Sequence, residues 1–173
     1  MANLRALLDD FTADVVTRLA TEGAGAHGLT ARVRGNEAYV GSYDRWVVHV
    51  IVEDDRVVLN TIDPETGAWR TQTLASTDAL EAEIAEVAPE LAVAVDQLTV
   101  HRLERGRAYR IARDFTDTQG HGFVAGEVLV FESLDHLPHD DGYTVGFAGR
   151  GMWIAGDSET FARFGVLVVP ADD

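Results

Sequence analysis

The stretch RWVVHVIVEDDRVVLNTI, residues 45–62, decides the fold of the first half of the chain. Two runs rich in β-branched residues flank the short acidic sequence EDD, which is typical of two antiparallel strands joined by a tight connection. Similar runs lie at residues 29–35, 37–43 and 68–74, and the sequence DPETG at 63–67 combines Pro and Gly as a turn requires. Residues 29–74 are therefore predicted to form an antiparallel meander.

Alternation within this stretch predicts which side chains share a face of the sheet. Val48, Val50 and Val52 are expected on one face, and Val47, His49 and Ile51 on the other. His49 is interpreted as a half-buried histidine on the outer face. Because no carboxylate adjoins it in the sequence, a ligand or proton-relay role is not expected for His49.

Helical periodicity brackets the meander on both sides. In the first segment, apolar residues recur at the spacing of one helical face: Leu4, Leu7, Leu8, Phe11, Val15, Val16 and Leu19. In the second segment, the stripe consists of Leu80, Ile84, Val87, Leu91 and Val95, after a cap at Ser76, Thr77 or Asp78. Pro89 is expected to kink or split the second helix. Both helices are predicted to cover one face of the sheet.

From residue 99 onward the pattern is almost entirely that of short strands with glycine at the joints. Strands are expected at 98–103 and 164–170 among others, and a single helical turn at 157–164. The fold class is predicted as α+β, with a helix-flanked antiparallel sheet at 1–98 and a small SH3-like β-barrel at 99–173.

Composition limits the function classes. A chain of 173 residues with 46% hydrophobic residues forms a folded core, and the absence of cysteine excludes disulfides and thiolate chemistry. A net charge of −15 opposes contact with nucleic-acid phosphates. The longest apolar run, residues 46–52, is too short for a membrane span, and no secretory signal is recognised. A cytoplasmic protein without nucleic-acid or membrane partners is expected.

Residues 103–147 resemble a bacterial family known only as a domain of unknown function. The resemblance lies in an opening strand with Gly106 and Tyr109, a Phe115-x-Asp117 turn, Gly126-Glu127 before an apolar strand, and Leu137-Pro138 before the turn Asp140-Asp141-Gly142. It implies a compact SH3-like β domain without an assigned activity. The helix, sheet, helix order of the first half is similar to that of bacterial secretion-chaperone-like domains, which bind protein segments.

The sequence HLPHDDG, residues 136–142, is the candidate metal site. His136, His139 and Asp140, with His121 from the sequence QGHGF, supply enough donors for an ion held by imidazole and carboxylate groups. The same letters also describe a tight turn, in which Asp accepts hydrogen bonds from local amides and Gly allows positive φ. The turn is the favoured interpretation. Glu127 is expected to pair with Arg110 or Arg150 rather than to act as a buried base.

Aromatic residues are the candidate binding residues. Trp46, Trp69, Tyr39 and Tyr43 lie in or beside the first sheet, and Trp153 and Tyr143 lie in the second part of the chain. Most of these rings are expected in the core, whereas Trp69 with Arg45 and Arg70 is predicted to form a binding patch on the sheet face that the helices leave uncovered.

Three functional hypotheses follow. The first is a non-enzymatic acidic module of the immunity, chaperone or regulatory type, without a cofactor, which binds another protein of basic character. The second is a metal-assisted hydrolase that uses the cluster at 136–141. The third is an acidic mimic of nucleic acid.

Overall fold

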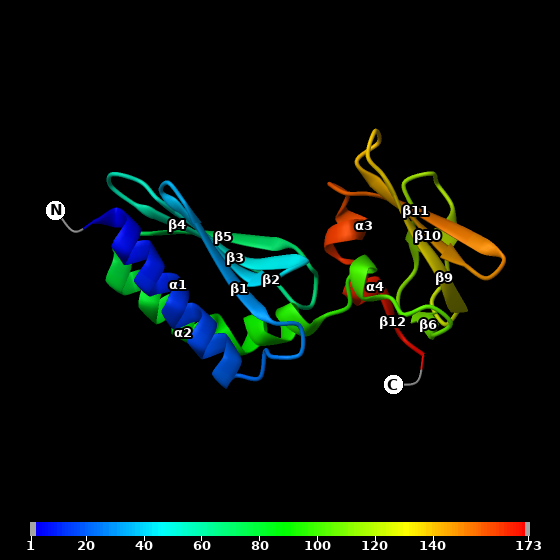
Figure 1. The fold of residues 1–173 in the computed structure, drawn as a ribbon, viewed down its shortest axis with the longest axis horizontal. Coiled ribbons are helices and arrows are strands. Elements are labelled where there is room, and N and C mark those ends of the chain that lie inside the picture. Colours follow the sequence, from blue (N-terminus) through cyan, green and yellow to red (C-terminus); the bar gives the residue numbers. More distant parts are fainter. Residues whose placement is uncertain (1–2, 172–173) are drawn as a thin grey trace. The chain divides into compact units, whose positions relative to one another are not determined.

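The chain separates into two compact units in a computed structural model that describes residues 3–171 (Figure 1). The first unit comprises the chain up to Pro64 together with Trp69–Gln97, and the second comprises Glu65–Ala68 and the chain from Leu98 onward. Each unit has its own cluster of buried apolar side chains. The protein is α+β, with mostly antiparallel sheets.

The first unit is a five-stranded meander with two helices on one face. Its elements are α1 (Leu4–Thr21), β1 (Leu29–Arg34), β2 (Glu37–Ser42), β3 (Arg45–Val52), β4 (Val57–Ile62), β5 (Trp69–Leu74) and α2 (Thr77–Asp96). The strands lie in chain order, and each pairs antiparallel with the next. Helix α1 packs on β1 and β2, and α2 packs on β3, β4 and β5. The predicted meander with its two covering helices is thus confirmed.

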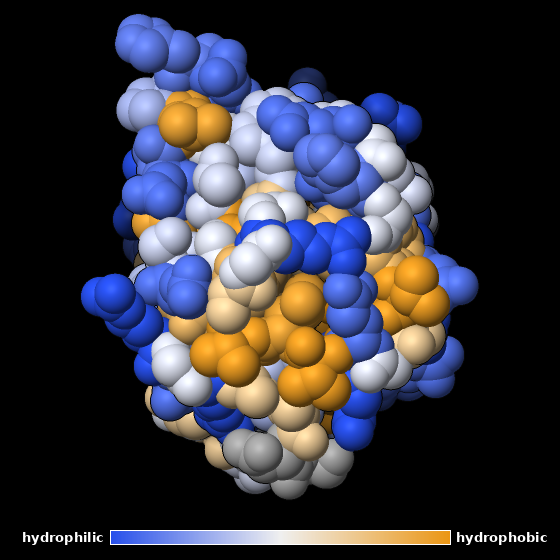
Figure 2. All heavy atoms as spheres, turned by 90° about the vertical axis from the view of Figure 1, so that its right-hand side faces the viewer, coloured by the Kyte–Doolittle hydropathy of each residue, from blue (hydrophilic) through white to orange (hydrophobic). Residues whose placement is uncertain are grey.

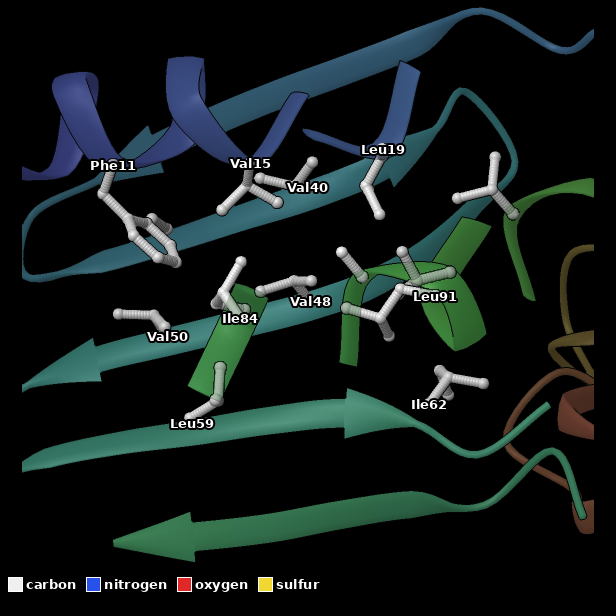
Figure 3. Close-up of a cluster of buried hydrophobic side chains, with 14 of the residues drawn as sticks. Phe11, Val15, Leu19, Val40, Val48, Val50, Leu59, Ile62, Ile84 and Leu91 are labelled. Atoms are coloured by element: carbon white, nitrogen blue, oxygen red, sulfur yellow. The ribbon is translucent and has the colours of Figure 1, made fainter. Parts of the chain in front are cut away.

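The core of the first unit lies between the helices and the sheet (Figure 3). The helices contribute Phe11, Val15 and Leu19 from α1 and Ile84 and Leu91 from α2, and the strands contribute Val40, Val48, Val50 and Leu59. These residues are nearly all less than 2% exposed, and the two helical stripes predicted from the sequence supply the helical side of this core. Asn3 and Ser76 accept backbone hydrogen bonds at the starts of α1 and α2.

Helix α2 continues through Pro89, so the predicted split does not occur. Pro89 lacks the N–H that would donate to the carbonyl one turn earlier, but Ala88, Leu91 and Ala92 on both sides of it are buried against the sheet. Tertiary packing therefore outweighs the loss of one hydrogen bond.

The alternation predicted for β3 is wrong at one position. Val40 lies opposite Val48, but Gly41 lies opposite Trp46, so β3 carries one extra residue and forms a bulge. As a result Val47 and Val48 are both buried in the core. A Cβ on Gly41 would lie 2.1 Å from the carbonyl oxygen of Arg45, so only glycine fits beneath this bulge.

The second unit is built mainly from strands. Its elements are a 3₁₀ turn η1 (Val100–Arg102), β6 (Ala108–Ile111), β7 (Phe115–Thr116), β8 (Gly122–Phe123), β9 (Val128–Leu137), β10 (Gly142–Phe147), β11 (Arg150–Ala155), α3 (Glu159–Ala162), α4 (Phe164–Leu167) and β12 (Val168–Pro170). One sheet has the order β11-β10-β9-β6-β12, and β7 pairs with β8. Buried rings of Tyr109, Phe123 and Phe164 fill its core.

Two strand predictions in the second unit are corrected. Residues 98–103 contain η1 instead of a strand, and residues 164–167 form α4 before the short strand β12 begins. In both segments apolar residues such as Val100, Phe164 and Leu167 enter the core from a helical turn, and short apolar runs do not distinguish that geometry from a strand. The predicted helical turn at 157–164 is confirmed and is capped by Ser158.

Part of the surface is apolar. Figure 2 shows a group of hydrophobic residues on one face, and the exposed large apolar residues of the second unit are Val124, Val128 and Val130. In β9, Val128 and Val130 alternate with the buried Leu129 and Phe131. No helix among residues 3–171 is both long enough and apolar enough to cross a membrane.

Candidate functional site: the open face of the first sheet

The face of the first sheet opposite α1 and α2, here called the open face, carries one row of side chains across all five strands. The row consists of Arg32, Tyr39, His49, Asn60 and Thr71, which lie directly opposite one another in the strand register. Side chains directly opposite each other in an antiparallel sheet are close enough to interact. The register therefore assembles residues that are far apart in the sequence.

Three aromatic rings form the centre of the open face. The rings of Tyr39 and His49 are parallel, with an interplanar angle of 4° and centroids 4.3 Å apart. Trp46 lies next to them, with its centroid 5.7 Å from that of Tyr39. The bulge at Gly41 brings Trp46 to this position, because it shifts the register at the start of β3. Tyr39 and Trp46 are half-buried and do not belong to the core.

Polar contacts surround two of these rings, Tyr39 and His49. The hydroxyl of Tyr39 donates to Glu37 Oε2 over 2.6 Å, and His49 Nε2 lies 3.5 Å from the same oxygen. On the other side of the ring, Asn60 Nδ2 is 3.4 Å from His49 Nδ1, and the hydroxyl of Thr71 donates to Asn60 Oδ1 over 2.7 Å. Tyr39, His49, Asn60 and Thr71 of the row therefore form, with Glu37, a connected network that orients the rings of Tyr39 and His49.

His49 is half-buried on the outer face, as predicted, but it does have a carboxylate beside it. The sequence shows no carboxylate next to His49, but the pairing of β2 with β3 places Glu37 beside its ring. The hydrogen bond from Tyr39 holds the pKa of Glu37 below its ordinary value, against the opposing effect of partial burial, and His49 acts in the same direction as Tyr39. The same hydrogen bond, together with burial, raises the pKa of Tyr39.

A hollow of about 250 Å³ adjoins the rings and is lined by Arg32, Arg34, Tyr39 and Trp46. Within residues 3–171, neither Arg32 nor Arg34 forms an ion pair or a side-chain hydrogen bond. Most other arginines of the first unit do form such contacts, including Arg5, Arg18, Arg56 and Arg70. The hollow thus combines two unpaired cations with two aromatic side chains.

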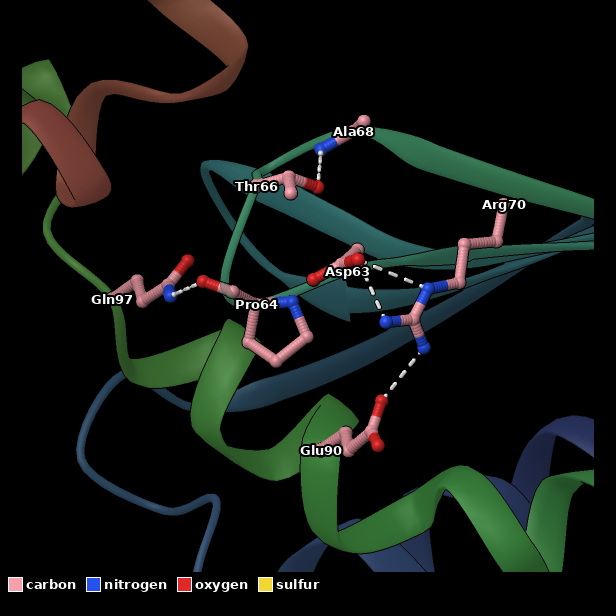
Figure 4. A network of polar contacts seen from close by, with 7 residues as sticks. All are labelled: Asp63, Pro64, Thr66, Ala68, Arg70, Glu90 and Gln97. Atoms are coloured by element: carbon pink, nitrogen blue, oxygen red, sulfur yellow. Dashed lines mark hydrogen bonds and ion pairs between the residues drawn. The ribbon is translucent and has the colours of Figure 1, made fainter.

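The predicted patch of Trp69, Arg45 and Arg70 is distributed differently. Arg70 donates to Asp63 over 2.7 Å and to Glu90 of α2 over 2.9 Å, so its guanidinium is directed toward the helix side (Figure 4). Trp69 is 46% exposed at the start of β5. Arg45 begins β3 opposite Ser42 of β2, and β4 lies between it and β5. Figure 4 also shows Gln97 bonded to the carbonyl of Pro64 beside this network.

The predicted metal ligands are likewise dispersed over the second unit. His121 is bonded to Asp117, the ring of His136 lies 5.0 Å from that of Tyr143, and His139 and Asp140 belong to the turn between β9 and β10. Across residues 3–171, no three histidine, aspartate or glutamate side chains are grouped so that they could hold a metal ion. The turn is present, with Asp141 rather than the predicted Gly142 at positive φ. Glu127 pairs with Arg150 over 2.5 Å, as predicted.

Comparisons with known proteins do not assign the chain to a family. No protein-family model matches it, and no curated protein matches it. Among solved structures, an integron cassette protein from the mobile metagenome of Vibrio cholerae is similar to it with a TM-score of 0.37 and 18% identity, over 39% of this chain and 87% of the other.

Proposed function

We propose that the protein is a non-enzymatic module that binds another protein, and that the open face of the first sheet is its binding surface. The observation that carries this proposal is the hollow in which unpaired Arg32 and Arg34 adjoin Tyr39 and Trp46. Trp, Tyr and Arg are the residue types that contribute most to binding energy at protein interfaces.

The contacts that fix the Tyr39 ring in the free protein favour binding. Ordering a flexible side chain at an interface costs free energy, and a ring already fixed in the free protein avoids most of that cost. Tyr39 is fixed by Glu37 and by stacking on His49, and His49 in turn is fixed by Asn60. The network therefore presents Tyr39 in a set orientation, next to the ring of Trp46.

The residues that line the hollow indicate which side chains of the partner would bind there. Two unpaired guanidinium groups favour a carboxylate, and the adjoining rings favour an apolar or aromatic side chain next to it. The net charge of −15 favours a partner that is basic outside this contact, because long-range attraction accelerates association. We therefore propose a basic partner segment that inserts an apolar residue beside an acidic one.

The proposal also concerns the fold of the second unit and the role of the protein in the cell. The two halves of β9 pair with different strands, β6 and β10, which supports an SH3-like barrel. An immunity, chaperone or regulatory role in the cytoplasm agrees with a binding surface of this kind.

Selection from a display library of random peptides tests the proposal. The wild-type protein is the bait, and the double variant Arg32→Glu/Arg34→Glu is the counter-selection bait. Arg56→Glu is the matched control, because Arg56 is an exposed arginine of the same unit, paired with Glu53 in the β3–β4 connection. We expect enriched peptides with an acidic and apolar pair in a basic context. These peptides should bind Arg32→Glu/Arg34→Glu at least about tenfold more weakly than the wild type, and they should bind Arg56→Glu about as well as the wild type.

Amide chemical shifts of the labelled protein then locate the bound peptide. We expect the bound peptide to change the amide chemical shifts of residues in β1, β2 and β3. Peptides that bind the double variant as well as the wild type, shifts confined to the apolar residues of β9, or a selection that enriches nothing would each reject the open face as the binding surface.

A further inference from the structure

The loop between β7 and β8 in the second unit is organised around one buried carboxylate. The side chain of Asp117 is fully buried, and its Oδ1 accepts hydrogen bonds from the backbone N–H groups of Gln119 and His121 over 2.9 and 2.8 Å. Its Oδ2 accepts the backbone N–H of Trp153 in β11 over 3.0 Å. Asp117 thus links two parts of the loop to each other and also links the loop to β11.

The same carboxylate orients the imidazole of His121. Oδ2 of Asp117 lies 3.1 Å from His121 Nδ1, while 58% of the His121 side chain is exposed. A carboxylate at Nδ1 fixes both the ring and its tautomer, so that Nε2 of the neutral ring is left as a hydrogen-bond acceptor. In the neutral ring, Nε2 of His121 is therefore an acceptor in a fixed position.

His121 borders a cleft of about 560 Å³. The cleft is lined by Gln119, His121, Thr144, Arg150, Met152 and Trp153, together with two glycines, Gly149 and Gly151. A Cβ added to Gly151 would meet no atom within 4 Å, so the absence of a side chain there leaves space in the cleft. An aromatic wall with a few placed polar groups is the usual composition of a small-molecule site.

The charges in the cleft are already paired. Arg150 donates to Glu127 over 2.5 Å and to the carbonyl of Gly122, and its guanidinium lies 4.0 Å from the centroid of Phe123. Asp117 is buried beneath its four donors. The cleft therefore offers hydrogen-bond donors, an acceptor and an indole ring without an unpaired cation, which favours a neutral ligand over an anionic one.

We propose that this cleft is a binding site for a neutral, hydroxyl-bearing small molecule of the saccharide class, with a ligand hydroxyl donating to His121 Nε2 and the ligand's apolar side against Trp153. The proposal goes beyond peptide binding by the first unit and does not depend on it. The competing explanation is that Asp117 only fixes the loop, in which case His121 is dispensable.

Ligand-observed NMR and titration calorimetry of the full chain test the site, with glucose, galactose, N-acetylglucosamine and maltose as probes. Glucose 6-phosphate serves as the anionic comparison. At least one neutral sugar should bind in the millimolar range expected for a ligand of this size. If none binds at tens of millimolar, or if the phosphorylated sugar binds more tightly than its neutral parent, the proposal is overturned.

Two variants separate binding from folding. Gly151→Val fills the cleft and should weaken binding at least about tenfold, whereas Gly25→Val, at an equally open glycine of the first unit, should leave it unchanged. His121→Phe keeps a ring but removes the acceptor, and it should weaken binding about tenfold while amide shifts at Asp117 and Trp153 remain close to those of the wild type. If Gly151→Val and His121→Phe bind the sugar as well as the wild type does, His121 serves only to hold the loop. Peptide binding by the first unit should be unaffected by any of these changes.

Discussion

The open face of the first unit and the His121 cleft of the second unit each position an imidazole, but they do so by different means. His49 is held within the first sheet, where the pairing of three strands, β2, β3 and β4, brings Glu37, Tyr39 and Asn60 to its ring. His121 is held within a loop by one buried carboxylate, Asp117. The first arrangement spreads its support over three strand pairs and gives a broad surface. The second concentrates its support in one residue and gives a cleft.

The largest expected effect tests whether the two cores are separate. Ile84 is 1% exposed between α2 and the sheet, so Ile84→Ala should lower the free energy of unfolding by about 2–5 kcal/mol through lost burial and the cavity it leaves. Hydrogen exchange should show lost protection in the first unit and retained protection in the second. Glu86→Ala, at an exposed position of the same helix, should change stability by less than about 0.5 kcal/mol. Equal loss of protection in both units would show that they unfold together.

The next effect tests how far the second unit relies on Asp117. Asp117→Asn places an amide NH₂ or a weaker acceptor opposite buried donors, including the N–H of Trp153, and should cost about 2–3 kcal/mol of stability. Thermal unfolding measures the loss, and Asp157→Asn, at an exposed carboxylate of the same unit, is the control. A loss below about 0.5 kcal/mol would contradict the anchoring role of Asp117.

The stabilisation by Asp117 should also depend on pH. Burial by itself raises the pKa of Asp117, but hydrogen bonds from Trp153 and His121 outweigh it and lower the folded-state pKa below the ordinary value. The stabilisation is therefore fully present above the pKa of the unfolded chain and is lost as the pH falls through the folded-state pKa. Denaturant unfolding should show the difference between wild type and Asp117→Asn shrinking toward acid pH. A difference in stability that does not change with pH would show that Asp117 is not ionised in the folded protein.

A smaller effect tests the bulge that positions Trp46. In Gly41→Ala the new Cβ would overlap the carbonyl of Arg45, so β3 must shift, at a cost of about 1–3 kcal/mol. Selected peptides should bind this variant more weakly, and the fluorescence of Trp46 should change in a background where Trp69 and Trp153 are replaced by Phe. Gly25→Ala should have neither effect. Unchanged peptide binding would mean that the position of Trp46 does not matter.

The smallest effect concerns the hydrogen bond within the open face. Tyr39→Phe removes the donor to Glu37, so the pKa of Glu37 should rise toward its ordinary value. Titration of the Glu37 carboxyl by carbon-detected NMR measures this rise, and Tyr43→Phe, at a tyrosine that is 67% exposed, is the control. An unchanged Glu37 pKa would assign its lowering to His49 instead.

The local patterns of the sequence were sufficient for the framework of the first unit. The spacing of Phe11, Val15 and Leu19 identified the buried face of α1, and the DPETG sequence identified the connection before β5. The second unit was harder to predict, because residues 98–103 and 164–167 are short apolar runs whose backbone form depends on the core that they join. The sequence likewise leaves a kink and a split at Pro89 as alternatives, and the packing of α2 on the sheet excludes the split.

The candidate sites were less predictable than the fold. The alternation of Tyr39 between Ala38 and Val40 was a signal for its place on the open face, but the proximity of Glu37 to His49 required the strand register. The resemblance in the second half marked Asp117 without indicating that it is buried or that Trp153, far along the chain, donates to it. The sequence predicts Arg70 as a residue of the binding patch, and only the packing of α2 on the sheet shows that Arg70 bonds to Glu90.

The sequence by itself determined α1, α2, the meander and the net negative charge, because periodicity, turn chemistry and charge are properties of neighbouring residues. The tertiary structure alone decided which imidazole meets which carboxylate and which arginines remain unpaired. These depend on register and on a single bulge, and one residue of shift in a strand moves every following side chain to the opposite face.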